Sequence, residues 1–446
     1  MVTSRRALLQ SLIPLPLLPH LGRALEAGLV PTAGASLAAI PPSPDPAQWR
    51  RHFPALAQTV AGRPLAYLDT AATAQRPDAV IEAIVGFYRQ DNANPGRTLH
   101  TLARRAHEAY EAARRTVAAF IGAADPLEVV FTRGTTEAIN LVATAWGGAN
   151  LRPGDEVVLT IAEHASSMLP WQLAARRAGA SVRYVDVTDE GLVEPERLKA
   201  HLTSRTRIVV CTHVSNVLGV INPARELCAV AREAGATVLL DAAQSVPHFP
   251  VDVGDLGCDF LAFSGHKMMG PMGCGVLWGR RSLLDAMPPY QAGSNMAHDA
   301  DLERADYAPG ALRFGAGTPS VADAVGLAAA VSFLNGLGRE AVWRHEQALV
   351  GYALDRLAGV PGLRLLGSAR PEDRIGVFSF VLERKQPETV VAELDRRGIA
   401  IRAGDLAALP LLRRSGVNRA ARASLYLYTT EEEVDRLADA LTVASG

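Results

Sequence analysis

The amino-acid sequence predicts an α/β protein, with a large domain built on a mainly parallel sheet and a smaller α+β domain after it. From about residue 70, short β-branched runs alternate with segments of helical periodicity, which is typical of a parallel sheet with helices on both faces. After Gly317-Thr318-Pro319 the pattern changes to long helical runs and a few strands. We therefore expect a leader over 1–45, an N-terminal segment of the small domain over 46–70, a large domain over 71–315 and a small domain over 316–446.

The strands expected in the large domain are Glu128–Thr132, Glu156–Ile161, Val182–Val187, Arg207–Thr212, Thr237–Leu240, Phe260–Phe263 and Gly275–Trp278. The helices expected between them include Thr136–Trp146, Pro170–Ala178 and Ala224–Ala234. The small domain is expected to contain helices Val321–Leu337, Arg339–Ala358 and Glu431–Ala444 and strands Gly376–Val381, Ala400–Arg402 and Ala423–Leu427. Because ligands bind beyond the carboxyl ends of the strands in an open parallel sheet, the residues after each strand are the first candidates for a site.

Composition and net charge limit the classes of partner that this chain could bind. The net charge of −1 and the pI near 6.8 leave no basic surface for nucleic acid or an anionic membrane, and we expect neither as a partner. No uninterrupted apolar stretch is long enough to span a bilayer. The four cysteines form no C-x-x-C pair and no zinc spacing, so we expect free thiols and no metal site.

The first residues resemble an export signal. Ser4-Arg5-Arg6-Ala7-Leu8 is similar to a twin-arginine motif, and a largely apolar stretch follows it. This pattern predicts a periplasmic protein that is exported in the folded state. The alternative is a Pro-rich, disordered leader on a cytoplasmic protein, because Pro14, Pro16 and Pro19 would break a helix there.

Lysine is rare in this chain. Three of the 45 basic residues, Lys199, Lys267 and Lys385, are lysine. Lys199 and Lys385 lie in polar contexts typical of the surface, whereas Lys267 lies between an apolar strand and a glycine-rich stretch. A desolvated lysine has a lowered pKa and is a better nucleophile, a role that Arg cannot fill. Lys267 is therefore the first candidate for a catalytic amine, and the alternative is a lysine that extends its charged end to solvent.

Polar residues that could bind the same cofactor follow other predicted strands. Asp241 ends an apolar strand, where a carboxylate is costly unless it is paired, and a protonated pyridine nitrogen is a suitable partner. Thr135 and Thr136 open a helix, which favours a phosphate site, although a plain capping segment would look the same. His164 ends another strand and could stack on a flat ring. All of these groups are expected at one edge of one sheet, which favours a cofactor site over separate structural roles.

Five co-linear motifs resemble those of class V aminotransferases, and most of all their cysteine desulfurase and selenocysteine lyase branch. They are Tyr67-Leu68-Asp69-Thr70-Ala71-Ala72, Arg133-Gly134-Thr135-Thr136-Glu137-Ala138-Ile139-Asn140, His213-Val214-Ser215-Asn216-Val217-Leu218-Gly219, Asp241-Ala242-Ala243-Gln244-Ser245 and Ser264-Gly265-His266-Lys267. The resemblance runs from about residue 48 to the C-terminus. It implies the aspartate aminotransferase-like fold (fold type I) and pyridoxal 5'-phosphate as the cofactor.

The resemblance also implies roles for individual residues. Lys267 would form the Schiff base and move protons, and His164 would stack on the ring as the second catalytic residue. The remaining cofactor contacts would be Asp241 to the pyridine nitrogen, Gln244 to the ring hydroxyl, and Thr135, Thr136, Ser264 and His266 to the phosphate, with Thr318 contributed by the second subunit of a homodimer. Asn216 and Arg422 would hold the substrate carboxylate, while Ala72, His100 and the loop that begins at Arg402 would shape the substrate pocket.

The sequence departs from the desulfurase pattern in that loop. Members of the branch read Arg-x-Gly-His-His-Cys-Ala-x-Pro, whereas here Asp405, Leu406 and Ala407 occupy the His-His-Cys positions, and Gly315 replaces a usual Glu. Alanine cannot attack a substrate sulfur or carry a persulfide. A C–S lyase that works by β-elimination needs only Lys267 as base and is the favoured prediction. The alternatives are an aminotransferase, an epimerase similar to isopenicillin N epimerase, a desulfurase with an atypical mechanism, and a non-catalytic binding protein.

Overall fold

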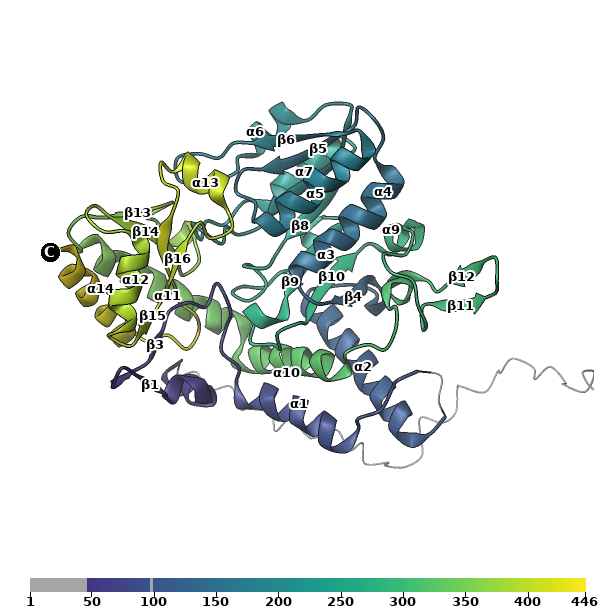
Figure 1. Cartoon of the computed structure of the whole chain (residues 1–446), viewed down its shortest axis with the longest axis horizontal. Coiled ribbons are helices and arrows are strands. Elements are labelled where there is room, and N and C mark those ends of the chain that lie inside the picture. Colours follow the sequence, from purple (N-terminus) through teal and green to yellow (C-terminus); the bar gives the residue numbers. More distant parts are fainter. Residues whose placement is uncertain (1–45, 97–98) are drawn as a thin grey trace, which may run out of the picture. The chain divides into compact units, whose positions relative to one another are not determined.

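A seven-stranded sheet forms the centre of the computed structural model, which describes residues 46–96 and 99–446 (Figure 1). The strand order is β4-β10-β9-β8-β7-β5-β6. The strands are β4 (Val129–Thr132), β5 (Glu156–Thr160), β6 (Ser181–Val185), β7 (Thr206–Thr212), β8 (Thr237–Asp241), β9 (Phe260–Ser264) and β10 (Gly275–Gly279). Neighbours from β9 to β6 run parallel, while β10 runs antiparallel to β9 and β4. The predicted α/β class with a mainly parallel sheet is confirmed.

Helices cover both faces of this sheet, which is why its strands are continuous apolar runs. Along β7, Val209 and Cys211 pack into the core on one face, and Ile208 and Val210 pack into the core on the other. The helices of this part are α1 (Asp78–Gln90), α2 (Thr101–Phe120), α3 (Thr135–Leu141), a π-helical turn (Val142–Trp146), α4 (Gly147–Asn150), α5 (Ala165–Ala178), α6 (Pro195–His201), α7 (Ala224–Glu233), α8 (Val253–Leu256) and α9 (Arg281–Ala286). Of these, the sequence predicted the segments of α3, α5 and α7 and left out α1 and α2.

A second, antiparallel sheet has the order β13-β14-β17-β16. Its strands are β13 (Leu363–Leu365), β14 (Val377–Leu382), β16 (Arg402–Gly404) and β17 (Ala420–Ser424), and the helices of this part are α11 (Arg339–Ala358), α12 (Pro387–Asp395), α13 (Leu409–Arg414) and α14 (Glu431–Ser445). The N-terminal strand β3 (Ala66–Tyr67) pairs with β15 (Ile399–Ala400), so the start of the described chain joins the core of the C-terminal part. The smaller elements are β1 (Thr59–Val60), β2 (Arg63–Pro64), β11 (Ala297–Ala300) and β12 (Ala305–Tyr307).

Two further features concern the C-terminal third. The predicted strand Ala423–Leu427 is wrong, because β17 already ends at Ser424 and Tyr426 is buried by side-chain packing outside the strand ladder. Helix α10 (Val321–Leu337) packs against α1 and α2 and adds to their apolar core (Figure 1). The domain limits given from the sequence remain predictions. In the described part of the chain, no single helix is long and apolar enough to cross a membrane, and α10 with α11 meets those criteria only as a pair bent by 77°.

Candidate active site

A cavity of about 420 Å³ lies beyond the carboxyl ends of the parallel strands. Segments from the N-terminal end, the central sheet and the C-terminal part all contribute to its wall. The residues predicted for the site that line it are Ala72, Thr135, Thr136, His164, Asn216, Asp241, Gln244, Ser264, His266, Lys267, Arg402 and Arg422. The fold therefore brings together residues that lie as far apart in the sequence as Ala72 and Arg422.

Lys267 lies in a short turn, Gly265–Lys267, directly after β9. Burial lowers the pKa of its ammonium from 10.5 to about 8, although the carboxylate of Asp241 acts in the opposite direction. A larger fraction of free amine is therefore present at neutral pH than for a lysine in water. Gly265 permits this turn because a Cβ there would lie 3.0 Å from the carbonyl oxygen of Cys274.

Asp241 is the last residue of β8 and is almost fully buried. Its Oδ1 accepts a hydrogen bond from the backbone N–H of Ala243 (3.0 Å), and its Oδ2 accepts one from the hydroxyl of Ser167 (3.1 Å). The carboxylate still lines the cavity, so lone pairs remain for a cationic partner. The protonated ring nitrogen of pyridoxal 5'-phosphate fits this requirement.

Hydroxyl groups gather where the chain enters α3. The Oγ of Ser264 accepts a hydrogen bond from the backbone N–H of Thr135 (2.8 Å) and lies 2.6 Å from its Oγ1, and the Oγ1 of Thr136 lies 2.7 Å from the Oγ of Ser166. Gly275 of β10 packs so closely that a Cβ there would lie 2.4 Å from the Cα of Gly134. Hydroxyls together with the N-terminal end of a helix fit a phosphate group.

The remaining cofactor candidates are two histidines and a glutamine. His164 caps α5, with its Nδ1 accepting from the backbone N–H of Ser166 (3.0 Å), and burial followed by the charge of Lys267 lowers its pKa. Burial lowers the pKa of His266 to about 4, so this ring is neutral at neutral pH. Gln244 donates from Nε2 to the backbone carbonyl of Ala71 (2.8 Å).

The guanidinium group of Arg422 also lines the cavity. Arg422 donates from Nη1 to the backbone carbonyl of Asn216 (2.9 Å), and its Nη2 lies 3.5 Å from Asp69. The Nε of Arg422 is buried without a partner, and burial lowers the pKa of the guanidinium group to about 10. Because this guanidinium group lines the cavity, a substrate carboxylate is a suitable partner for its charge. Arg402, by contrast, already donates from Nε and Nη2 to Asp69.

The loop that departs from the desulfurase pattern is held against the cavity. Leu406 and Ala407 both have left-handed backbone angles (φ 51° and 54°), a conformation that is unfavourable for residues other than glycine. The carbonyl of Ala407 accepts from the N–H of Ala165 (2.7 Å), and that of Leu406 accepts from the side chain of Asn216 (2.9 Å). Ala407 thus presents only a methyl group to the cavity.

No cysteine thiol lies in this cavity. All four cysteines are free and buried elsewhere. Burial raises the pKa of Cys228 and of Cys274 to about 12, and it also raises the pKa of Cys211 and of Cys258 well above the usual value for a thiol. These thiols are therefore protonated at neutral pH and are poor nucleophiles.

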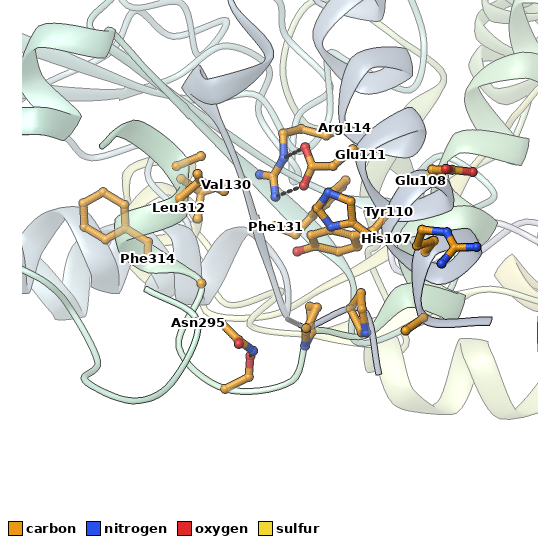
Figure 2. Close-up of a pocket in the computed structure, with 18 residues that line it drawn as sticks. His107, Glu108, Tyr110, Glu111, Arg114, Val130, Phe131, Asn295, Leu312 and Phe314 are labelled. Atoms are coloured by element: carbon orange, nitrogen blue, oxygen red, sulfur yellow. Dashed lines mark hydrogen bonds and ion pairs between the residues drawn. The ribbon is translucent and has the colours of Figure 1, made fainter. Parts of the chain in front are cut away.

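Two predicted residues lie outside the cavity of this chain. Thr318 is at the surface, where its hydroxyl accepts from the side chain of Asn94 (3.0 Å), and His100 caps α2 with Nδ1 accepting from Ala103. Gly317 and Pro319, which flank Thr318, line a second cavity of about 510 Å³. Figure 2 shows Tyr110, Glu111, Arg114 and Phe131 on its wall.

Four polar residues at or behind the main cavity were not predicted from the sequence. They are Asp69, Glu163, Ser166 and Ser167. Asp69 lies within a motif that was recognised, and the others flank His164, so their positions next to candidate residues were the available signal.

Comparison with known proteins gives the family. The model for aminotransferase class-V matches residues 66–437. This chain belongs to that family. It is 48% identical over 88% of its length to a cysteine desulfurase of Synechococcus elongatus, but spans only 63% of that relative. It is 47% identical to a cysteine desulfurase of Pectobacterium atrosepticum, with 87% of this chain and 95% of the relative covered.

Solved structures agree with this placement. The cysteine desulfurase CsdA from Escherichia coli matches with a TM-score of 0.82 and 37% identity over 90% of this chain and 98% of that one. A C-DES mutant with glycine covalently linked to its PLP cofactor matches with a TM-score of 0.77 and 25% identity over 88% of this chain and 98% of that one. The predicted family and fold are confirmed.

Proposed function

We propose that this chain cleaves the Cβ–S bond of cysteine or a cysteine derivative by β-elimination, with pyridoxal 5'-phosphate as its cofactor. The class-V family and the fold support a pyridoxal-phosphate enzyme. Two features of the cavity together support the proposal. Lys267 is buried with a lowered pKa, and no cysteine thiol lines the cavity wall. When bound, the cofactor withdraws electrons and weakens the bonds at the substrate α-carbon.

Each side chain has one task in this proposal. Asp241 would hold the proton on the ring nitrogen, and His164 would cover one face of the ring. Thr135 and Ser264 would bind the phosphate, with Thr136 and His266 beside them and Gln244 at the ring hydroxyl. Arg422, which lines the cavity, would hold the substrate carboxylate with its guanidinium group. The family resemblance implies these roles, and the position of these residues on the wall of one cavity supports them.

Lys267 would be the principal acid–base group. Its amine takes the proton from the substrate α-carbon, and the electron pair of the Cβ–S bond then leaves with the sulfur. Sulfide or a thiolate departs, and the remaining three-carbon unit is released as pyruvate and ammonia after addition of water. No protein thiol takes part, which is consistent with a methyl group at position 407.

A second candidate is sulfur transfer by an unusual route. The relatives at 45–48% identity are named cysteine desulfurases, or probable ones, which favours this alternative. A desulfurase must pass the sulfur to an acceptor and would release alanine instead of pyruvate. Transamination and epimerisation would give neither sulfide nor pyruvate.

Product analysis separates these reactions. We expect the purified protein to be yellow and to release sulfide and pyruvate in equal amounts from L-cysteine, and cysteine persulfide and pyruvate in equal amounts from cystine. Lys267→Ala should lose both the visible absorption and the activity, while Lys385→Ala serves as a matched control at the surface. Alanine as the main carbon product would contradict β-elimination and support sulfur transfer. A colourless protein that takes up no added cofactor would contradict the whole proposal.

We also propose that the chain forms a homodimer in which Thr318 reaches the phosphate site of the partner. Thr318 is exposed in the single chain and adjoins the second cavity, which is more apolar than the main one. Light scattering after size exclusion should give twice the mass of the 47.4 kDa chain. A monomer that retains full activity would contradict this arrangement.

A further inference from the structure

A second carboxyl group lies behind Asp241. Glu163 precedes His164 in the segment between β5 and α5 and has no exposed surface. Its Oε1 accepts hydrogen bonds from the hydroxyl of Thr160 (2.7 Å) and from the backbone N–H of Thr212 (2.9 Å). Its Oε2 is buried and has no partner. Among the described residues, no Arg, Lys or His forms an ion pair with it.

The surroundings of Glu163 disfavour a negative charge. The titratable groups near it are Asp241 and the thiol of Cys211, and neither is cationic. Burial, and then the charge of Asp241, raise the pKa of Glu163 to about 8. Two buried carboxylates without a cation between them cannot both be ionised at low cost. Since Asp241 opens onto the cavity and can pair with a cation there, Glu163 is the neutral member of the pair at neutral pH.

Ser167 connects the two carboxyl groups. Its fully buried hydroxyl donates to Oδ2 of Asp241 (3.1 Å) and lies near enough to Glu163 to influence the pKa of that carboxyl. A hydroxyl has a single proton. Because Ser167 gives this proton to Asp241, a hydrogen bond between Ser167 and Glu163 requires the serine oxygen to accept, and only a protonated carboxyl can donate to it. This arrangement also provides the partner that Oε2 of Glu163 otherwise lacks.

We propose that Glu163 is a positioning residue that acts as a neutral carboxylic acid: through Ser167 it directs a hydrogen bond onto Asp241 and so fixes the carboxylate that faces the cofactor ring nitrogen. The proposal rests on the cofactor site described under Proposed function. Its chemical consequence is a switch with pH. Once Glu163 ionises, it competes for the proton of Ser167 and places a second negative charge behind Asp241.

The variant Glu163→Gln tests the neutral state directly. A glutamine amide keeps the shape of the protonated acid, donating to Ser167 and accepting from Thr160 and Thr212, but cannot ionise. We expect visible absorption and circular dichroism of the Glu163→Gln holoenzyme to match the wild type at neutral pH. The two proteins should diverge as the pH rises through about 8.

Two disruptive variants and one control complete the experiment. Glu163→Ala and Ser167→Ala should shift the visible spectrum at neutral pH and lower kcat/KM by about tenfold, as expected for loss of one hydrogen bond to a charged group. Glu156→Gln is the control, because Glu156 is a buried carboxylate on β5 that forms ion pairs with Arg183 and Arg205. It should lower stability without changing the spectrum.

Two results would overturn the proposal. The first is a Glu163→Gln spectrum that differs from the wild type at neutral pH, because the charged form would then be the working one. The second is identical spectra of the two proteins at every pH. Both differ from failure of the proposed function, in which the wild type itself would bind no cofactor or Lys267→Ala would keep the visible band.

Discussion

Replacing Lys267 with methionine should stabilise the cofactor-free protein although it abolishes activity. Lys267 is fully buried, and burial lowers its pKa from 10.5 to about 8. At about 1.4 kcal/mol per pKa unit, placing the ammonium in this site costs roughly 3 kcal/mol of folding free energy. Methionine fills a similar volume without a charge, so Lys267→Met should raise the free energy of unfolding by up to about 3 kcal/mol at neutral pH.

The size of the effect depends on pH. Because the folded protein binds this proton less tightly than the unfolded chain, the cost of burying Lys267 is present in full below a pH of about 8. It declines as the pH rises to 10.5 and is absent above that value. The stabilisation by Lys267→Met should therefore be largest at neutral pH and disappear in alkali.

Urea unfolding followed by far-UV circular dichroism measures this difference. Wild type and variant are compared after removal of the cofactor, at neutral pH and at several alkaline values. Lys385→Met is the control, since Lys385 is a partly exposed residue paired with Glu393, and its loss should cost no more than about 1 kcal/mol. A Lys267→Met protein that is less stable at neutral pH, or a gain that persists above pH 10.5, would refute the reasoning.

Three further predictions concern the substrate, the loop and the leader. Arg422→Gln should raise KM by about tenfold or more with a smaller effect on kcat, because a bidentate contact to the substrate carboxylate is lost; an unchanged KM would exclude Arg422 from that role. Ala407→Cys places a thiol at the cavity wall without altering the backbone. We expect mass spectrometry to detect a persulfide on this variant and alanine to replace part of the pyruvate. A variant without a persulfide that makes only pyruvate would mean that the loop does not bring this side chain to the substrate sulfur. Arg5→Lys combined with Arg6→Lys should retain the protein in the cytoplasm on cell fractionation, whereas unchanged export would exclude a twin-arginine signal. Arg5 and Arg6 lie outside the described residues.

Residues that end buried strands were predictable. Asp241 and Lys267 follow apolar runs, and a polar group at that position in a parallel sheet faces the ligand edge. The limits of strands were less accurate. Burial and strand pairing produce similar apolar patterns, which is why the segment at Tyr426 was assigned to a strand although it is buried outside the ladder.

Contacts between distant segments could not be predicted. Asp69 pairs with Arg402 and lies near Arg422, more than 330 positions away in the sequence, and the pairing of β3 with β15 and the bridge between Asp69 and Ser424 bring them together. Likewise, His100 was predicted to line the substrate pocket, but in this chain it caps α2. A single sequence carries no signal for such long-range contacts.

By itself, the sequence determined the fold class, the family and the identity of the candidate amine, because these depend on local periodicity, on the resemblance of five co-linear motifs and on a lysine that is rare in this chain. The tertiary structure decided which polar atoms lack a hydrogen-bond partner, namely the buried Nε of Arg422 and the buried Oε2 of Glu163. It also decided that the methyl group of Ala407 lies at the cavity wall, at the position where the desulfurase pattern has a thiol. Burial and hydrogen-bond saturation depend on the atoms that surround a side chain, and most of these come from segments that are far away in the sequence. Lys267 could be found from its neighbours in the sequence, whereas its lowered pKa depends on its surroundings in the fold.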